Sequence, residues 1–215
     1  MLPGSFVEGK NWNYSERSDG YEYETRGVVS LSTDEIRRLM VACGGDKPVP
    51  TRNRALFAMM YRAGLRVSEA LDLYPKDVDL GAGAVRVLNG KGGRSRTVGL
   101  DPGAAAVVRA WLAVRASEGI GEGFPLLCTW DGGRVSESYV RVLMARLRRK
   151  AGIAKRVHAH GLRHTHAAQL REEGVDIGII SKQLGHRSIA TTARYLDHIA
   201  PCDVINAMTR RTWSV

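Results

Sequence analysis

The stretch AVRVLNGKGGRSRTVGL, residues 84–100, is the clearest β-hairpin signal in this chain. Two short segments with β-branched residues, 84–88 and 96–100, flank an NGKGGRS turn that contains Asn-Gly and Gly-Gly pairs. This pattern predicts an antiparallel hairpin whose tip carries Lys91. Helical periodicity dominates the surrounding sequence. The expected fold class is therefore α+β, mostly helical, with a small antiparallel sheet.

Apolar periodicity and capping residues predict the helices. Ser32 and Glu35 have the spacing of a capping box, and Asp101-Pro102 is a typical helix start. The expected helices cover about 32–42, 52–63, 67–73, 102–117, 136–150, 160–173, 176–184, 189–198 and 202–211. The segment LLCTW at 126–130 is expected to be a third strand, and GGDKPVP at 44–50 a loop.

Composition points to a soluble globular protein of 215 residues, with 44% hydrophobic and 7% aromatic residues. No apolar run approaches the roughly 20 residues that span a bilayer, and the first residues lack the pattern of a signal peptide. The three cysteines are far apart and fit no metal-binding spacing. We therefore expect a cytoplasmic protein with no membrane association.

The net charge of +10 and the pI near 9.9 point to a polyanionic partner, with nucleic acid as the default. The charge is uneven along the chain. Residues 1–30 hold five acids and three bases, whereas residues 138–171 hold nine Lys or Arg and no acid. This one-sided run favours binding to a nucleic-acid backbone over a generic basic surface.

The stretch HAHGLRHTH at 158–166 first suggests a metal site, because His160 and His164 are four residues apart. Arg163 would place a permanent cation beside such a metal, and no acid lies nearby to offset it. A phosphate is the better ligand, because an arginine near a helix N-terminus can bind two of its oxygens. We expect no metal and no cofactor. Taken alone, the stretch also fits a basic DNA-facing helix without chemistry.

Four further segments accompany this one, namely GLRVSE at 64–69, the hairpin with its lysine, LGH at 184–186 and TTARY at 191–195. In this order the five segments resemble the tyrosine recombinase (phage integrase) family, and the likeness covers residues 32–200. The resemblance implies a tyrosine recombinase catalytic fold. It also implies the following catalytic set: Arg66, Lys91, His160, Arg163, His186 and Tyr195.

The resemblance implies site-specific DNA recombination or integration without metal or ATP. Tyr195 would attack a backbone phosphate and form a 3′-phosphotyrosyl link. Arg66, Arg163 and His186 would stabilise the phosphate oxygens. Lys91 would protonate the leaving 5′-oxygen, and His160 would assist proton transfer at the tyrosine.

Two rival functions stay open at this stage. One is DNA relaxation of the type IB topoisomerase kind, and the other is a catalytically silent DNA-binding protein. Glu69 is expected to orient Arg66, and His164 to be mainly structural. His158 and His166 match no required position and are treated as incidental or as DNA contacts.

Domain organisation follows from the same resemblance and from residues 1–30, which are polar and lack helical periodicity. Residues 1–30 are expected to form an arm or linker, and residues 31–215 the catalytic domain with a C-terminal helix. Family members usually carry a helical core-binding domain ahead of the catalytic domain, and we expect no complete one here. The expected partners are double-stranded DNA and further copies of the chain, as a tetrameric synapse on DNA and a monomer when free. The source would be prokaryotic or a phage.

Overall fold

The computed structural model describes residues 30–88, 95–186 and 209. Within them the chain is mostly helical with a small antiparallel sheet, as the sequence predicted. The helices expected at 189–198 and 202–211 lie outside this part, apart from Thr209, and so do residues 1–29. The helices are α1 (Thr33–Ala42), α2 (Pro48–Tyr61), α3 (Val67–Leu71), α4 (Pro102–Ser117), α5 (Glu137–Lys150), α6 (Ala159–Glu172) and α7 (Ile177–Leu184), with a 3₁₀ turn, η1 (Pro75–Asp77).

The predicted hairpin is confirmed by strands β2 (Ala84–Val87) and β3 (Arg96–Gly99), which pair antiparallel with Val85 opposite Val98. The turn at 89–94 lies outside the described residues. The third strand of the sheet is β1 (Val78–Asp79), which pairs with β2 and completes the order β1-β2-β3. A two-residue strand is too short to leave a period-2 pattern, so the sequence did not reveal it.

The prediction of a strand at 126–130 is wrong, because only one isolated bridge pair forms there. Instead, buried side chains donate hydrogen bonds to backbone carbonyls of this segment. Arg115 donates hydrogen bonds to the carbonyls of Pro125 and Leu126 at 2.6 and 3.0 Å, and the indole of Trp111 donates to Leu126 at 2.7 Å. The segment is therefore an irregular, buried loop that α4 holds in place.

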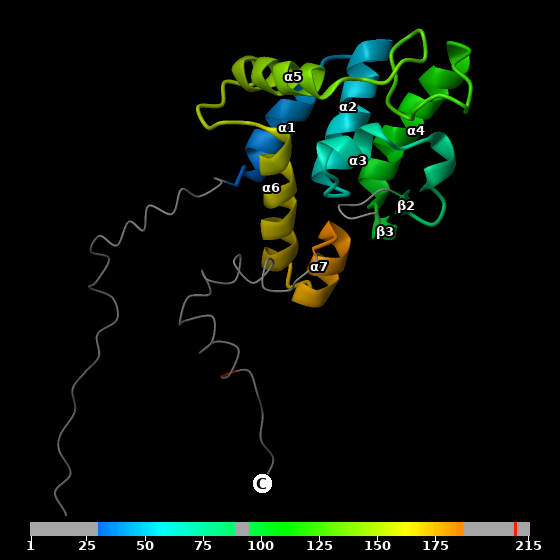
Figure 1. The fold of residues 1–215 in the computed structure, drawn as a ribbon. Coiled ribbons are helices and arrows are strands. Elements are labelled where there is room, and N and C mark those ends of the chain that lie inside the picture. The colour runs from blue at the N-terminus through cyan, green and yellow to red at the C-terminus, as the bar shows by residue number, and fades with distance from the viewer. Residues whose placement is uncertain (1–29, 89–94, 187–208, 210–215) are drawn as a thin grey trace, which may run out of the picture.

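Helix α2 is the central helix of the described part, with α4 on one side and α6 on the other (Figure 1). Ten of its fourteen residues are buried, which is typical of a helix that packs on all sides. The helix begins at Pro48, so the loop expected at 44–50 is shorter than predicted. A proline is tolerated in the first helical turn because the backbone N–H it lacks would have no partner inside the helix.

Helix α6 runs away from the layer of α1 and α5, and α7 packs beside its far end (Figure 1). The main core lies around α2, whereas α7 contributes to a separate small cluster of Ala167, Ile180 and Leu184. So small a cluster supplies little apolar burial, and polar contacts must help to hold α7 in place. In the part of the chain that the structure describes, no helix is both long and apolar enough to cross a membrane.

We expect Arg115→Met to lower the free energy of unfolding by about 3 kcal/mol, because it removes the hydrogen bonds that the buried guanidinium donates to the carbonyls of Pro125, Leu126 and Gly121. Urea unfolding followed by circular dichroism measures this change. Arg109→Met is the matched control, since Arg109 is an exposed arginine of the same helix, and it should stay within about 0.5 kcal/mol of wild type. Equal stability of the two variants would contradict the assigned role of Arg115.

Candidate functional site

Arg163 on α6 has a buried side chain that joins three distant segments. Its guanidinium donates hydrogen bonds to the backbone carbonyls of Gly64 and Leu184. Gly64 lies in the break between α2 and α3, and Leu184 is the last residue of α7. Carbonyls near helix C-termini lack partners inside the helix and carry partial negative charge, so they can stabilise a buried cation. Arg163 therefore brings the GLRVSE and LGH segments together.

Arg66 lies directly before α3, and a buried carboxylate holds it. Glu69 accepts hydrogen bonds from the Arg66 backbone N–H at 2.9 Å and from its Nη1 at 2.7 Å. The same carboxylate accepts two more from Arg96 on β3, both at 2.8 Å. The expected role of Glu69 in orienting Arg66 agrees with these contacts, and Arg96 is a second arginine on the same acid.

The carboxylate of Glu69 is charged at neutral pH. Burial by itself would raise its pKa, but the hydrogen bonds from Arg96 and Arg66 lower that pKa to about 2. Sequence reasoning missed Arg96, although a signal exists. Arg96 and Val98 share one face of β3, and Val98 is buried, so the alternation placed an arginine on the core side of a strand. A cation in that position needs a buried anion.

His186 follows the turn that ends α7. Gly185 adopts a left-handed conformation with φ +63°, and a Cβ there would lie 2.6 Å from Nε of Arg96. Burial, together with the charges of Arg163, Arg66 and Arg96, lowers the pKa of His186 to about 4. These arginines surround His186 closely enough to act on it, so the imidazole is neutral at neutral pH.

His160 and His164 form a pair on α6, with their Nε2 atoms 2.8 Å apart. Burial lowers the pKa of both side chains, and the charge of Arg163 also contributes to both shifts. The pKa of His164 falls to about 4. One neutral ring must donate the proton of this hydrogen bond and the other must accept it. His164, predicted to be mainly structural, is therefore in direct contact with the expected proton carrier His160.

The two remaining histidines of this stretch have local structural contacts. His158 is the N-cap of α6, and its Nδ1 accepts a hydrogen bond from the backbone N–H of Gly161 at 3.0 Å. His166 is buried against Gly64, where a Cβ would lie 2.7 Å from its Cδ2. Only glycine fits at position 64, because φ there is +63° and the imidazole fills the space.

The structure thus brings together four of the six predicted catalytic residues, Arg66, His160, Arg163 and His186. The charges of Arg66 and Arg163 act on both His160 and His186. Lys91 and Tyr195 lie outside the described residues, and their catalytic roles stay predictions. Lys91 lies in the sequence between β2 and β3, and Tyr195 follows His186 along the chain.

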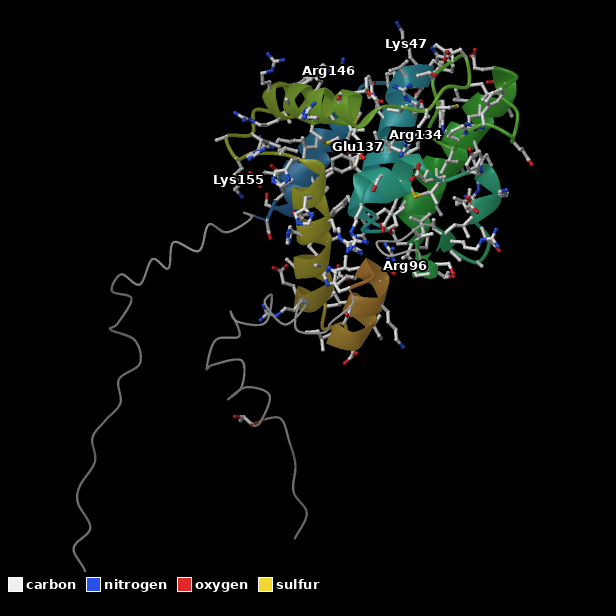
Figure 2. The ribbon with its side chains drawn as sticks, viewed as in Figure 1. Lys47, Arg96, Arg134, Glu137, Arg146 and Lys155 are labelled. Carbon is white, nitrogen blue, oxygen red and sulfur yellow. The ribbon has the colours of Figure 1, made fainter. Side chains whose placement is uncertain are left out.

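A groove of about 560 Å³ adjoins the site between α5 and the start of α6. His158 and His160 are part of its lining, and three arginines also line it, namely Arg141, Arg148 and Arg156. Figure 2 shows further basic side chains nearby, with Arg146 on α5 and Lys155 beside the start of α6. The lining also includes one acid, Glu137, so the three arginines leave the groove with a net positive charge.

The site is chemically suited to an anion. Two permanent cations and neutral imidazoles surround it, and its nearest acid, Glu69, already pairs with two arginines. No three side chains of His, Cys, Asp or Glu among the described residues gather as a metal site would require. Planar guanidinium groups and imidazole N–H donors match the oxygens of a phosphate.

Comparison with known proteins gives consistent results. A family model described as the phage integrase family matches residues 30–200. Tyrosine recombinase XerC of Rhodospirillum centenum is 42% identical over 170 residues, which make up 78% of this chain and 49% of that protein. The chain spans about half the length of the curated relatives it matches.

Solved structures share the fold. The crystal structure of XerA recombinase matches with a TM-score of 0.72 and 32% identity, covering 86% of this chain and 66% of that one. XerH recombinase bound to palindromic difH substrate, in a post-cleavage complex, matches with a TM-score of 0.67 and 27% identity over 85% of this chain and 53% of that one. These matches confirm the fold that the sequence predicted.

Buried His166 makes stability depend on pH. Burial, together with the charges of Arg62 and Arg163, lowers its pKa to about 4 from the usual 6.5, although Asp101 acts in the opposite direction. The unfolded chain therefore binds a proton at higher pH than the folded chain. This contribution to stability is complete above pH 6.5 and is lost as the pH falls toward 4.

We therefore expect wild type to lose more stability than His166→Gln between pH 7 and pH 4.5, by about 2 kcal/mol. Glutamine removes the titrating group but keeps a polar side chain of similar size. Urea unfolding at the two pH values measures the difference, and each protein serves as its own reference. An identical loss in both proteins would show that His166 is not responsible.

Proposed function

Since the chain belongs to the phage integrase family, we propose that it breaks and rejoins DNA at specific sites through a covalent tyrosyl intermediate. One observation carries the proposal. Arg66, His160, Arg163 and His186 come from three separate parts of the chain, and yet they act on one another electrostatically at one site. Residues 31–215 form the catalytic domain in this proposal.

The proposed reaction is a transesterification at phosphorus. The phenolic oxygen of Tyr195 forms a bond to the phosphorus atom, and the bond from phosphorus to the 5′-oxygen breaks. His160 assists removal of the phenolic proton, since an unperturbed tyrosine with a pKa of about 10 is protonated at neutral pH. Lys91 supplies a proton to the departing 5′-oxygen. Attack by a 5′-hydroxyl of a second DNA strand reverses these changes and releases Tyr195, so neither metal nor ATP is needed.

The site residues that the structure describes support these roles. Arg163 is held by two carbonyls and Arg66 by one carboxylate, so both guanidinium planes are oriented before a phosphate arrives. Such preorganised donors stabilise charge that develops on phosphate oxygens. The depressed pKa of His186 leaves it a neutral N–H donor, and that of His160 leaves it able to accept a proton.

Double-stranded DNA is the proposed substrate. The net charge of +10 and the acid-free residues 138–171 suit a phosphate backbone. The related XerH recombinase was solved with a palindromic DNA substrate. Exchange between two duplexes requires four strands to be cut, and each chain supplies one Tyr195. We therefore propose a synapse of four copies on DNA, formed from chains that are monomeric when free.

A covalent-capture experiment tests the proposed function. The full chain is incubated, with and without EDTA, with nicked duplexes of randomised central sequence, in which cleavage releases a short strand and prevents religation. We expect a protein–DNA adduct on a denaturing gel for wild type and none for Tyr195→Phe, because phenylalanine lacks the attacking oxygen. Sequencing the captured DNA then identifies the preferred site.

The outcomes separate the alternatives. Absence of an adduct from wild type that is folded by circular dichroism would contradict the enzyme proposal and favour a silent DNA-binding protein. Relaxation of supercoiled plasmid without strand exchange between two captured sites would favour a topoisomerase. Loss of the wild-type adduct when EDTA is added would revive a metal mechanism.

A further inference from the structure

Arg96 is an arginine beside the site that the proposed reaction does not use. Both of its Nη atoms donate to Glu69 at 2.8 Å, one to each carboxylate oxygen. Its side chain is 14% exposed, against 29% for that of Arg66. Arg96 therefore lies deeper than Arg66 and makes the two-pronged contact with the acid, whereas the side chain of Arg66 makes a single contact.

The charges around Glu69 do not cancel. One carboxylate lies between two guanidinium groups, so the cluster of Glu69, Arg66 and Arg96 carries a net charge of +1. Without Arg96 the acid and Arg66 would form a neutral pair. Arg66 would then have no excess charge to offer a phosphate, and Glu69 could rotate to meet it alone. The forked contact from Arg96 also fixes the plane of the carboxylate.

Arg96 also contacts the opposite side of the site. Its Nε lies so close to Gly185 that any side chain at that position would collide with it. The same strand is held to α7 three residues further on, because Gln183 accepts from the N–H of Gly99 at 2.8 Å and donates to its carbonyl at 2.9 Å. Figure 2 shows Arg96 where β3 meets the end of α7. The position of Arg96 thus depends on the turn that carries His186.

We propose that Arg96 is a positioning residue for DNA cleavage: it takes up the charge of Glu69, so that the charge of Arg66 stays available to the phosphate, and it supports the turn before His186. This inference rests on the proposed function. Arg96 touches no reacting atom in this arrangement. It acts through Glu69 and Arg66, and through the packing of its guanidinium on Gly185.

Three variants of the full chain test the proposal. Arg96→Met removes the charge and keeps a long side chain, and Arg96→Lys keeps the charge without the fork. The matched control is Arg86→Met. Arg86 lies on the adjacent strand β2 and also contacts a buried carboxylate, Asp77, at 3.4 Å, but it is outside the site.

The first measurement needs no DNA. Titration of the Glu69 carboxyl carbon by NMR follows its pKa in wild type and in the variants. We expect the pKa to rise toward its usual value in Arg96→Met and to stay low in Arg86→Met, because Arg96 donates to this carboxylate and Arg86 contacts Asp77 instead. An unchanged pKa in Arg96→Met would overturn the inference, whether or not the protein cleaves DNA.

The second measurement compares two captured substrates, an ordinary phosphodiester and a methylphosphonate with one uncharged group at the cleaved phosphorus. We expect Arg96→Met to form adduct about 100-fold more slowly on the phosphodiester, and Arg96→Lys to be intermediate. On the methylphosphonate, which needs one cation fewer, the deficit should shrink to about threefold. Arg86→Met should match wild type on both substrates.

The results distinguish a positioning residue from a merely structural one. Equal deficits of Arg96→Met on both substrates, or a wild-type rate on the phosphodiester, would overturn the inference while leaving the proposed function intact. No adduct from wild type on either substrate would instead contradict the proposed function. Thermal unfolding of each variant confirms that the compared proteins are folded.

Discussion

The buried guanidinium of Arg163 is the interaction on which the site depends. A buried cation must be compensated, and the carbonyls of Gly64 and Leu184 both accept hydrogen bonds from Arg163. These carbonyls contribute partial negative charge, and the guanidinium itself stays a cation. The same contacts fix where α7 lies, since its own apolar cluster is small. One side chain therefore positions the helix that precedes His186 and keeps a positive charge facing the site.

Glycine makes this arrangement possible at both ends of the contact. Gly64 and Gly185 each adopt φ of +63°. This left-handed conformation ends α2 before Gly64 and α7 before Gly185, and lets the chain turn sharply at each point. Each also lies against a side chain, His166 for Gly64 and Arg96 for Gly185, so closely that no Cβ would fit. The glycines of the GLR and LGH segments thus serve packing as well as backbone conformation, and the arginines depend on both.

Local signals in the sequence predicted much of this structure. The capping box at Ser32, the start of α4 after Asp101 and the hairpin that contains Lys91 depend on neighbours within a few residues, which the sequence displays directly. The contacts that the sequence did not reveal are long-range and irregular. The buried loop held by Arg115 has no periodicity, and the partner of Arg96 is twenty-seven residues away on another element. The residues of the site could be predicted only where they belong to short sequence motifs, and their contacts with other elements could not.

The electrostatics of the site follow from using arginines where many phosphate-processing sites use metal ions. An excess of permanent cations is tolerable in the free protein because the histidines among them stay neutral, and burial together with Arg163 lowers the pKa of His160, His164 and His186. A bound phosphate would add a negative charge at the point where these cations act. The pKa values of the histidines would then rise, because an adjacent anion stabilises the imidazolium form. The site therefore gains proton-holding capacity when its substrate is present, which is when the proposed reaction requires it.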